Sequence, residues 1–283
     1  MIKSYLTIAW RHLTKHATIS LINILGLAIG IAACLIIFIY VDHELGFDKY
    51  NKKVGDIVRI SSLIHAPESD MHLAASPDPM ADALTRDYPE VVAVARLEES
   101  PANIRIHGDL SREKDFYKTD QSIFSVFDFS FIAGDTTGAL NRPDCIVLSK
   151  TMALRYLGAV NVTGKTININ NRDVLVTGVV EDRPVNSDIP LTALISADFS
   201  KSGEWVSPDL FTFALLRPGT ELAQFRKNIL GLSTRYAQPA LDKVDAKEYS
   251  MEFIPEPLAD LHFTTGRLGD TPKGNKDSIY IFS

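Results

Sequence analysis

The sequence predicts an α+β ectodomain, built of mixed sheets with helices in two lobes and preceded by one transmembrane α-helix. Residues 19–41 form an apolar run without a charged side chain. A helix of that length is about 34 Å long, enough to cross a hydrocarbon core of about 30 Å. From residue 42 onward, strand-like and helix-like segments alternate in a β-α-β order, which is typical of α+β folds.

The charges around the apolar run predict its orientation. Lys3, Arg11 and Lys15 precede the run without any acidic residue, whereas Asp42 and Glu44 follow it. Short flanks rich in lysine and arginine stay in the cytoplasm, so we expect the N-terminus inside and the main domain outside. The whole chain has a net charge of −6, so the outer part is strongly acidic. We therefore expect no nucleic-acid partner, because such a partner requires a basic patch.

Residues 1–18 are predicted to form an amphipathic helix on the cytoplasmic surface of the membrane. Apolar side chains recur at helical spacing in this segment, and Trp10 lies at the margin of their face. Lys3, Arg11 and Lys15 lie on the polar side, where they would face the lipid headgroups. The alternative is that this segment is only the basic flank of a membrane anchor.

Small residues inside the predicted span indicate helix packing. Gly26 and Gly30 form a GxxxG pattern, and Ala33 lies about one turn further along. Small side chains at this spacing allow another membrane helix to approach closely. Asn23 adds a polar group that favours a partner helix over lipid. We expect these four residues to form a helix-packing face.

Two other interpretations of residues 19–41 are weaker. A cleaved secretory signal has a shorter apolar stretch and a recognisable cleavage site, and this run lacks both features. Residues 31–34 resemble a lipobox ending at Cys34, but cleavage there would leave an apolar stretch where a polar tether is usual. The only other cysteine, Cys145, provides no basis for a disulfide framework.

The part of the chain beyond the span is predicted to contain strands at regular intervals. Apolar alternation and β-branched residues predict strands over residues 57–65, 91–98, 103–107, 145–148, 167–169, 173–180, 191–196, 211–216 and 249–254. Helices are predicted over residues 79–88, 149–157 and 220–236. We expect Ser149 and Gly158 to begin and end the second helix, and Thr220 to cap the third.

Catalytic and cofactor chemistry is not indicated. Residues 163–166 (TGKT) resemble the end of a phosphate-binding loop, but the required glycine is replaced by Ala159 and a strand follows. No serine lies in a nucleophile elbow, and no cysteine–histidine cluster has metal-binding spacing. We interpret His65, His72, His107 and His262 as surface or loop residues, and expect no enzyme, cofactor or metal.

Several segments, in order, resemble one family. They are the span with residues 23–30 (NILGLAIG), residues 46–50 (GFDKY), 58–60 (VRI), 149–158 (SKTMALRYLG), 174–184 (VLVTGVVEDRP) and 257–263 (PLADLHF). Together they are similar to the N-terminal part of a MacB/FtsX-type ABC transporter permease with its MacB-like periplasmic core domain. The resemblance covers essentially the whole chain.

The resemblance implies a domain organisation. The amphipathic helix would occupy residues 1–18, the transmembrane helix residues 19–41, and the periplasmic core domain residues 42–277. Lobe one would combine about 45–105 with 210–265, and lobe two would span about 106–209. Residues 278–283, an apolar stretch, would begin a truncated second transmembrane helix, the alternative being a terminal strand.

The resemblance also implies a function. The chain would be an N-terminal fragment of a permease subunit in the bacterial inner (plasma) membrane. It would couple ATP hydrolysis by a separate ABC ATPase subunit to movement of the periplasmic domain, for export or mechanotransmission. Its other partners would be a second permease copy or paralogue, the lipid bilayer, and a periplasmic adaptor or cargo. The alternative function is that of a single-span, membrane-anchored periplasmic binding or adaptor protein without transport activity.

Overall fold

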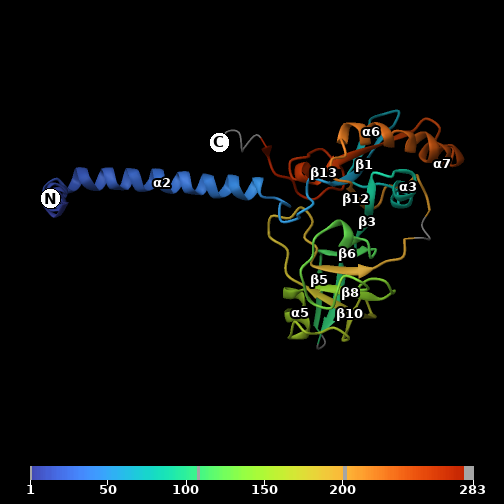
Figure 1. The fold of residues 1–283 in the computed structure, drawn as a ribbon, viewed down its shortest axis with the longest axis horizontal. Helices are drawn as coiled ribbons and strands as arrows, with labels where there is room; N and C mark the ends of the chain where they lie inside the picture. The colour runs from blue at the N-terminus through green and yellow to red at the C-terminus, as the bar shows by residue number, and fades with distance from the viewer. Residues whose placement is uncertain (1, 107–108, 200–202, 277–283) are drawn as a thin grey trace. The chain divides into compact units, whose positions relative to one another are not determined.

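The computed structural model describes residues 2–106, 109–199 and 203–276, and it divides into two compact units (Figure 1). The first unit comprises residues 1–46 and 275–283, and the second comprises residues 47–274. Residues 278–283, which we expect to begin a second transmembrane helix, lie outside the described residues. The second unit contains every strand that the structure describes.

The first unit contains two helices, α1 (Ile2–Lys15) and α2 (Ala17–Leu45), which are separated at His16. Helix α2 includes the whole predicted span and extends beyond it at both ends. Among the described residues it is the one helix that is long and apolar enough to cross a membrane, by length and composition. The helical conformation expected for residues 1–18 is thus confirmed over most of that segment.

The second unit is built on a mixed sheet. Its longest continuous path of paired strands runs in the order β13-β1-β12-β3-β6-β11-β8-β10-β9-β4-β5, while β2 pairs with β1 and β7 pairs with β10. Most pairs are antiparallel, but β8 with β10 and β6 with β11 are parallel. The strands are β1 (Ile57–His65), β2 (Met71–Leu73), β3 (Val91–Glu99), β4 (Ala102–Ile106), β5 (Asp109–Glu113), β6 (Phe116–Thr119), β7 (Phe131–Ala133), β8 (Cys145–Ser149), β9 (Thr166–Ile169), β10 (Arg172–Val180), β11 (Ala193–Ser196), β12 (Phe211–Leu216) and β13 (Ser250–Pro257).

Strand β1 lies between two strands that come from far along the chain. It pairs with β12 and, from Val58 to His65, with β13. Its first six residues are buried, because one face packs under helices and the other faces a second apolar cluster. The apolar residues Ile57, Val58 and Ile60 pack into these clusters, whereas the buried polar residues Arg59 and Ser61 make side-chain hydrogen bonds.

Helices cover parts of both ends of this unit (Figure 1). Helices α3 (Met80–Asp87) and α6 (Leu222–Ile229) pack beside β3 and β13, and α5 (Lys150–Leu157) packs on β8 and β10. The remaining helical segments are α4 (Ile123–Val126), a π-helical turn η1 (Ser233–Ala237), α7 (Gln238–Lys243) and α8 (Leu258–Leu261).

The predicted ends of α5 are confirmed. The Ser149 Oγ accepts a hydrogen bond from the Met152 backbone N–H, which satisfies a donor of the first helical turn. Gly158 ends the helix in the left-handed region at φ 71°, a conformation that favours glycine.

The helix predicted over residues 220–236 is wrong in its details. The chain forms α6, a π-helical turn and α7 in succession, so the helical region reaches Lys243. Thr220 is not the cap, because its hydroxyl donates to the Arg217 carbonyl and Glu221 occupies the cap position. Apolar spacing of three and four residues could not distinguish a regular helix from one that contains a π-helical turn.

Three apolar clusters fill the second unit. One joins α3, α6 and the π-helical turn to β1, β12 and β13, and another joins α5 to β8, β9 and β10. The third includes residues from both regions, such as Ile57, Phe213 and Val147. The division into lobes at about residues 105 and 210 stays a prediction.

Candidate functional site

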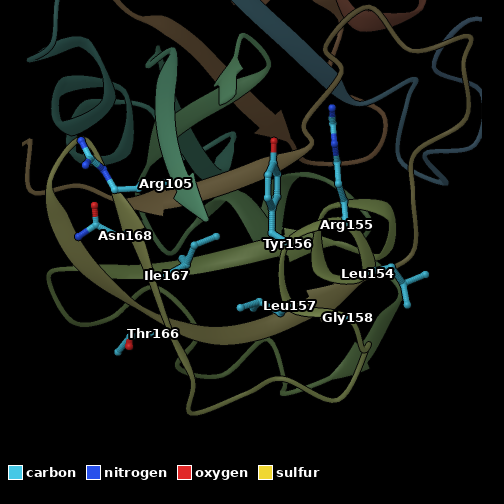
Figure 2. A pocket seen from close by; sticks show the side chains of 9 residues that line it. All are labelled: Arg105, Leu154, Arg155, Tyr156, Leu157, Gly158, Thr166, Ile167 and Asn168. Carbon is cyan, nitrogen blue, oxygen red and sulfur yellow. The ribbon is translucent and has the colours of Figure 1, made fainter. Parts of the chain in front are cut away.

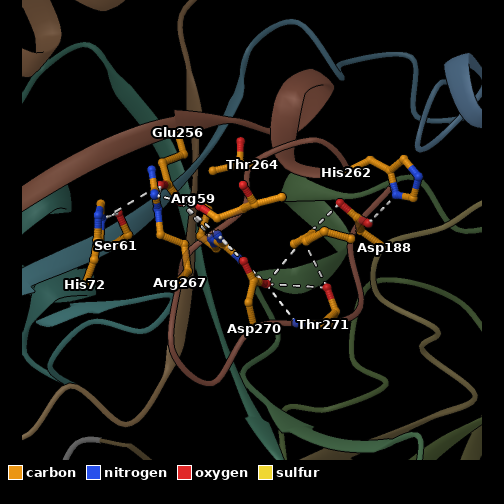
Figure 3. A network of polar contacts seen from close by, with 12 residues as sticks. Arg59, Ser61, His72, Asp188, Glu256, His262, Thr264, Arg267, Asp270 and Thr271 are labelled. Atoms are coloured by element: carbon orange, nitrogen blue, oxygen red, sulfur yellow. Dashed lines mark hydrogen bonds and ion pairs between the residues drawn. The ribbon is translucent and has the colours of Figure 1, made fainter. Parts of the chain in front are cut away.

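The first and the last segment of the second unit both contribute to one buried polar network (Figure 3). We call it the anchoring network. It consists of Asp48, Arg59, Asp188, Glu256, His262, Arg267, Asp270 and Lys273. These residues come from the first strand, the last strand and three loops, so sequence spacing alone does not group them.

The arriving segment, residues 47–51, is held by the loop that contains Ser187 and Asp188. Asp48 is buried and has φ 55°, in the left-handed region. Its carboxylate accepts hydrogen bonds from the Ser187 hydroxyl at 3.1 Å and the Asp188 backbone N–H at 3.3 Å. The Tyr50 hydroxyl lies 2.8 Å from the Ser187 hydroxyl. The first residues of the domain are therefore fixed to a loop about 140 positions later.

The departing segment, residues 262–274, is held by the same loop. His262 Nδ1 lies 3.1 Å from Asp188 Oδ1, and Lys273 Nζ lies 3.3 Å from Asp188 Oδ2. The Phe47 ring stacks on the His262 ring with their centroids 3.4 Å apart. Asp188 thus links both segments. His262 lies in the turn that follows α8, in agreement with its interpretation as a surface or loop residue, but its side chain is buried.

Arg59 forms the centre of the second half of the network, on β1. Its guanidinium donates two hydrogen bonds to Asp270, at 2.7 and 2.9 Å, and two to Glu256, at 3.2 and 2.8 Å. Arg267 adds a further bond to Glu256, and Lys273 lies 3.2 Å from Asp270. Lys273 therefore joins the Arg59 half of the network to Asp188.

The electrostatic surroundings of these groups differ. Burial disfavours the charge of Arg59, but the carboxylates of Asp270 and Glu256 outweigh burial and raise its pKa. Burial likewise opposes ionisation of Asp270, yet hydrogen bonds from Arg59 and its charge hold that pKa below the usual value. Burial and the neighbouring Asp188 carboxylate instead raise the pKa of Asp48. Two carboxyl groups of the network thus differ: the surroundings of Asp270 favour its anion, whereas those of Asp48 disfavour its anion.

Arg183 lies next to the arriving segment but is held mainly by aromatic rings. Its guanidinium lies 4.5 Å from the centre of the Phe129 ring and 5.3 Å from that of Tyr50, and it donates to the Tyr50 hydroxyl. The buried Nε and Nη2 atoms have no hydrogen-bond partner among the residues that the structure describes. Burial lowers the pKa of this arginine.

The sequence-predicted site residues belong to the first unit and are not part of this network. Trp10, Arg11 and Lys15 are exposed on α1, and the side chain of Lys3 lies outside the described residues. Asn23, Gly26, Gly30 and Ala33 are exposed on α2, and a Cβ at either glycine would meet no atom within 4 Å. The helix-packing face of these four residues stays a prediction.

Sequence reasoning missed the anchoring network, although a signal for it was available. Asp48, Arg59 and His262 each belong to a segment that carried the family resemblance, as does Arg183. These segments lie far apart in the sequence. In the structure they come together where the first and last segments of the domain meet. The signal was that these polar residues all lie in the segments that carry the family resemblance; no catalytic pattern was involved.

A pocket of about 530 Å³ lies beside α5 (Figure 2). Its polar side chains include Arg105, Arg155, Tyr156 and Asn168. Arg155 is already paired with Glu113 at 3.1 Å, and the Tyr156 hydroxyl contacts the same carboxylate. Thr166 also lines the pocket, but residues 163–166 form a turn that leads into β9, as predicted, and not a phosphate-binding loop before a helix.

Within the described part of the chain, no group of three or more histidine, cysteine, aspartate or glutamate side chains could hold a metal ion. The expectation that the chain is not an enzyme stays a prediction.

Comparison with solved structures shows the fold. A domain described as part of a permease protein from Porphyromonas gingivalis superposes with a TM-score of 0.65 at 17% identity, covering 82% of this chain and 99% of that one. The periplasmic region of MacB from Actinobacillus actinomycetemcomitans gives 0.48 at 15% identity, covering 71% and 90%. The extracellular domain of the ABC-type transporter YknZ from Gram-positive bacteria gives 0.47 at 13% identity, covering 70% and 99%.

The sequence comparisons identify the family. No curated protein matches the chain. The family model of the MacB-like periplasmic core domain matches residues 20–232, which is most of the chain. The mixed sheet with its helices agrees with the predicted α+β class. The chain therefore belongs to the MacB-like periplasmic core domain family of ABC transporter permeases.

Proposed function

We propose that this chain is the N-terminal part of a permease subunit that couples ATP hydrolysis by a separate ABC ATPase to movement of its periplasmic domain. In this proposal α2 crosses the bacterial inner membrane with its N-terminus in the cytoplasm, as the basic residues before it favour. The chain carries out no catalysis itself, and the movement serves export or mechanotransmission.

The observation that carries the proposal is the double role of Asp188. Its carboxylate contacts His262 and Lys273 of the departing segment, and its backbone N–H contacts Asp48 of the arriving segment. Rigid, hydrogen-bonded elements transmit displacement better than flexible tethers do, because they move as one body. A displacement of the helix before residue 47 would therefore reach the β1 strand and the 183–189 loop together.

The first unit provides two further contacts in the proposal. Helix α1, with Trp10, Arg11 and Lys15, lies on the inner membrane surface near the ATPase. The Gly26, Gly30 and Ala33 face of α2, with Asn23 beside it, packs against a helix of a second permease copy or paralogue.

Hydrogen exchange with the partner ATPase tests the coupling. The complete gene product would be co-purified with an ABC ATPase encoded beside it, and exchange would be compared with and without a slowly hydrolysed ATP analogue. We expect nucleotide-dependent changes in residues 183–189 and 262–274. Asp188→Asn should abolish these changes without reducing ATPase binding, because it weakens the link to Lys273 and His262.

The matched control is Glu181→Gln, whose carboxylate pairs with Lys150 at the surface. It should leave the exchange pattern unchanged, since an exposed pair contributes little. If no ABC ATPase associates and nucleotide has no effect on exchange, the proposal is wrong. The single-span, membrane-anchored binding or adaptor protein would then be the better interpretation.

Cysteine crosslinking between spans tests the packing face. Gly26→Leu with Gly30→Leu should reduce crosslinking of α2 to a second permease helix, because bulky side chains separate the backbones. Ala28→Leu with Ala32→Leu places the same bulk on the opposite side of α2 and should leave crosslinking intact. Equal crosslinking in both double variants would exclude this face.

A further inference from the structure

A histidine on the short strand β2 lies beside the anchoring network. Strands β2 and β13 pair with β1 on its two sides, so that Leu63 is aligned with His72 on one side and with Glu252 on the other. Alternate residues of a strand share a face of the sheet, and so do aligned residues of paired strands. His72 therefore projects from the same face as Arg59 and Glu256 (Figure 3).

The hydroxyl of Ser61 holds the imidazole of His72. The ring Nε2 lies 3.0 Å from Ser61 Oγ, and the same hydroxyl donates to the Ile254 carbonyl at 3.2 Å. Because a hydroxyl carries one hydrogen, its oxygen is left to accept from the Nε2–H of the neutral ring. The other ring nitrogen, Nδ1, is then the atom that takes up a proton. The side chain of His72 is 16% exposed, so protons from solvent can reach it.

The surroundings of this ring disfavour a positive charge on it. Glu256 Oε1 lies 3.9 Å from Nε2, but the same carboxylate already accepts hydrogen bonds from Arg59 and Arg267. Burial of the imidazole and, after it, the charge of Arg267 lower the pKa of His72 below its usual value. A protonated ring would be the third cation around one carboxylate.

Charges act on His72 from each element packed against β2. They are Arg59 on β1, Glu252 and Glu256 on β13, and Arg267 in the departing segment. Glu252 lies 3.3 Å from Arg226, and further along the departing segment Asp270 lies 3.2 Å from Lys273. The residue just before β2, Asp70, lies 3.0 Å from His65 at the surface. Among all these groups, Arg267 is the cation that acts most strongly on His72.

The backbone of β2 binds the departing segment directly. The Leu268 N–H donates to the His72 carbonyl at 2.7 Å, and the Ala74 N–H donates to the Leu268 carbonyl at 3.0 Å. Arg267 is the neighbour of Leu268 in the chain. Release of this segment from β2 would carry Arg267 away from the ring, so a proton on His72 favours the released state over the attached one.

We propose that His72 is a proton sensor that controls the attachment of the departing segment to β2 and the anchoring network. The neutral ring is compatible with Arg267 in place, whereas the protonated ring favours release. Because the pKa of His72 is lower in the attached state, attachment is strongest above the ordinary value of 6.5 and weakens as pH falls through that value towards the lower one. The sensor depends on the fold of the domain and not on coupling to an ATPase.

Histidine titration in the full chain in detergent tests the electrostatic step. Exchange of the ring C2 hydrogen depends on protonation, and mass spectrometry of peptides gives the pKa of each histidine separately. We expect His72 to titrate below its ordinary value of 6.5. Arg267→Gln should move this titration upwards by about half a pH unit or more, because it removes the nearest acting cation. Arg155→Gln, which removes an arginine paired with Glu113 on α5, should leave it unchanged.

Backbone hydrogen exchange measures the release itself. Exchange of the Leu268 amide would be compared between wild type and His72→Gln at the same pH, since glutamine can still bond Ser61 but stays neutral. The variant leaves both chain neighbours of Leu268 unchanged, so the ratio of rates reports the opening of the segment. Between about pH 7.5 and 5.5 this wild-type-to-variant ratio should rise about threefold, with an upper limit of about tenfold set by proton uptake of the released ring.

The matched control is His65→Gln, which removes an exposed histidine of β1 and should keep the full pH response. Parallel changes of exchange in wild type and His72→Gln, or an equal loss of the response in His65→Gln, would overturn the proposal. If His72→Gln does not fold, the titrations remain decisive. A His72 that titrates at or above its ordinary value, or that Arg267→Gln does not shift, excludes the sensor.

Discussion

Arg59 and Arg183 both bury guanidinium nitrogens in the same unit, but their surroundings are opposite. Arg59 donates four hydrogen bonds to two carboxylates, and these raise its pKa. Arg183 is surrounded by Phe127, Phe129 and Tyr50, and two of its nitrogens have no hydrogen-bond partner in the described part of the chain. Burial lowers its pKa.

A buried cation can thus be stabilised in two ways, by pairing with carboxylates or by contact with aromatic rings. A guanidinium paired with carboxylates cannot be removed without leaving buried anions behind, so its loss is costly. A guanidinium held by aromatic faces, such as that of Arg183, acts on the carboxylates of Asp48 and Asp128 only as a weaker, secondary influence. Its own desolvation offsets much of the cation–π attraction. We therefore expect the anchoring network to depend on Arg59 for stability, and Arg183 to contribute little.

Replacement of Arg59 should have the largest effect. Arg59→Met leaves the carboxylates of Asp270 and Glu256 buried, and we expect it to lower the free energy of unfolding by about 3 kcal/mol. Arg267 and Lys273 remain as partial partners, which keeps the loss near the low end for buried pairs. Denaturant titration of the full chain in detergent measures it.

The control for this prediction is Arg226→Met, which removes a surface pair with Glu252. Its effect should stay below about 1 kcal/mol, as for exposed ion pairs in general. Similar losses in the two variants would mean that burial of Arg59 has no energetic consequence.

Asp270 should give the next largest effect and a defined pH dependence. The pKa of this carboxyl is lower in the folded state than in the unfolded state. The stability it contributes is therefore present above the unfolded pKa of about 3.9 and is lost as pH falls through the folded pKa. Asp270→Asn should lower the free energy of unfolding by about 2 kcal/mol at pH 7.

The pH series distinguishes this cause from a packing defect. The difference between wild type and Asp270→Asn should shrink as pH falls from about 5 to 2, because the wild-type carboxyl becomes protonated. A difference that stayed constant over that range would show that ionisation of Asp270 does not matter.

Arg183 should tolerate an apolar replacement. Arg183→Met keeps a long side chain between the rings and removes two unpartnered buried N–H groups, so stability should stay within about 1 kcal/mol of wild type. A loss as large as that of Arg59→Met would contradict the comparison between the two arginines. Thermal unfolding of both variants under identical detergent conditions provides the measurement.

Asp48 should show the smallest effect at neutral pH and the opposite pH trend to Asp270. Burial raises its pKa, so its ionised form opposes folding, and this penalty disappears as pH falls from neutral through the folded pKa. Asp48→Asn should change stability at pH 7 by less than about 1 kcal/mol, because lost acceptor capacity offsets the removed charge. Relative to this variant, the wild type should gain stability as pH falls through the raised folded pKa of Asp48 towards the unfolded pKa of about 3.9.

Much of the fold was predictable because its signals are local. The strands β1 and β12 begin and end at the predicted residues, and the cap of α5 follows from Ser149 and Gly158. The strands β2, β5, β6 and β7 were missed, since each has only three to five residues and little apolar alternation. Short strands are specified by their partners more than by their own sequence.

The anchoring network could not be predicted because its contacts are not local. In the sequence, Asp188, Asp270 and Lys273 resemble ordinary surface charges in polar loops. Burial becomes visible only when β1, β13 and the 183–189 loop are brought together. Charged residues are rarely buried unless they are paired, so the sequence alone favoured the wrong environment.

The distance along the chain between Arg59 and Asp270 has a consequence for biosynthesis. The two residues are 211 positions apart, and translation at about 5–20 residues per second separates their appearance by roughly 10–40 s. Strand β1 is made before both of its neighbours, so it first lacks β12 and β13 and gains them only late in synthesis. Until β12 and β13 are made, β1 therefore has unpaired backbone groups at both edges, which favours aggregation of the nascent domain.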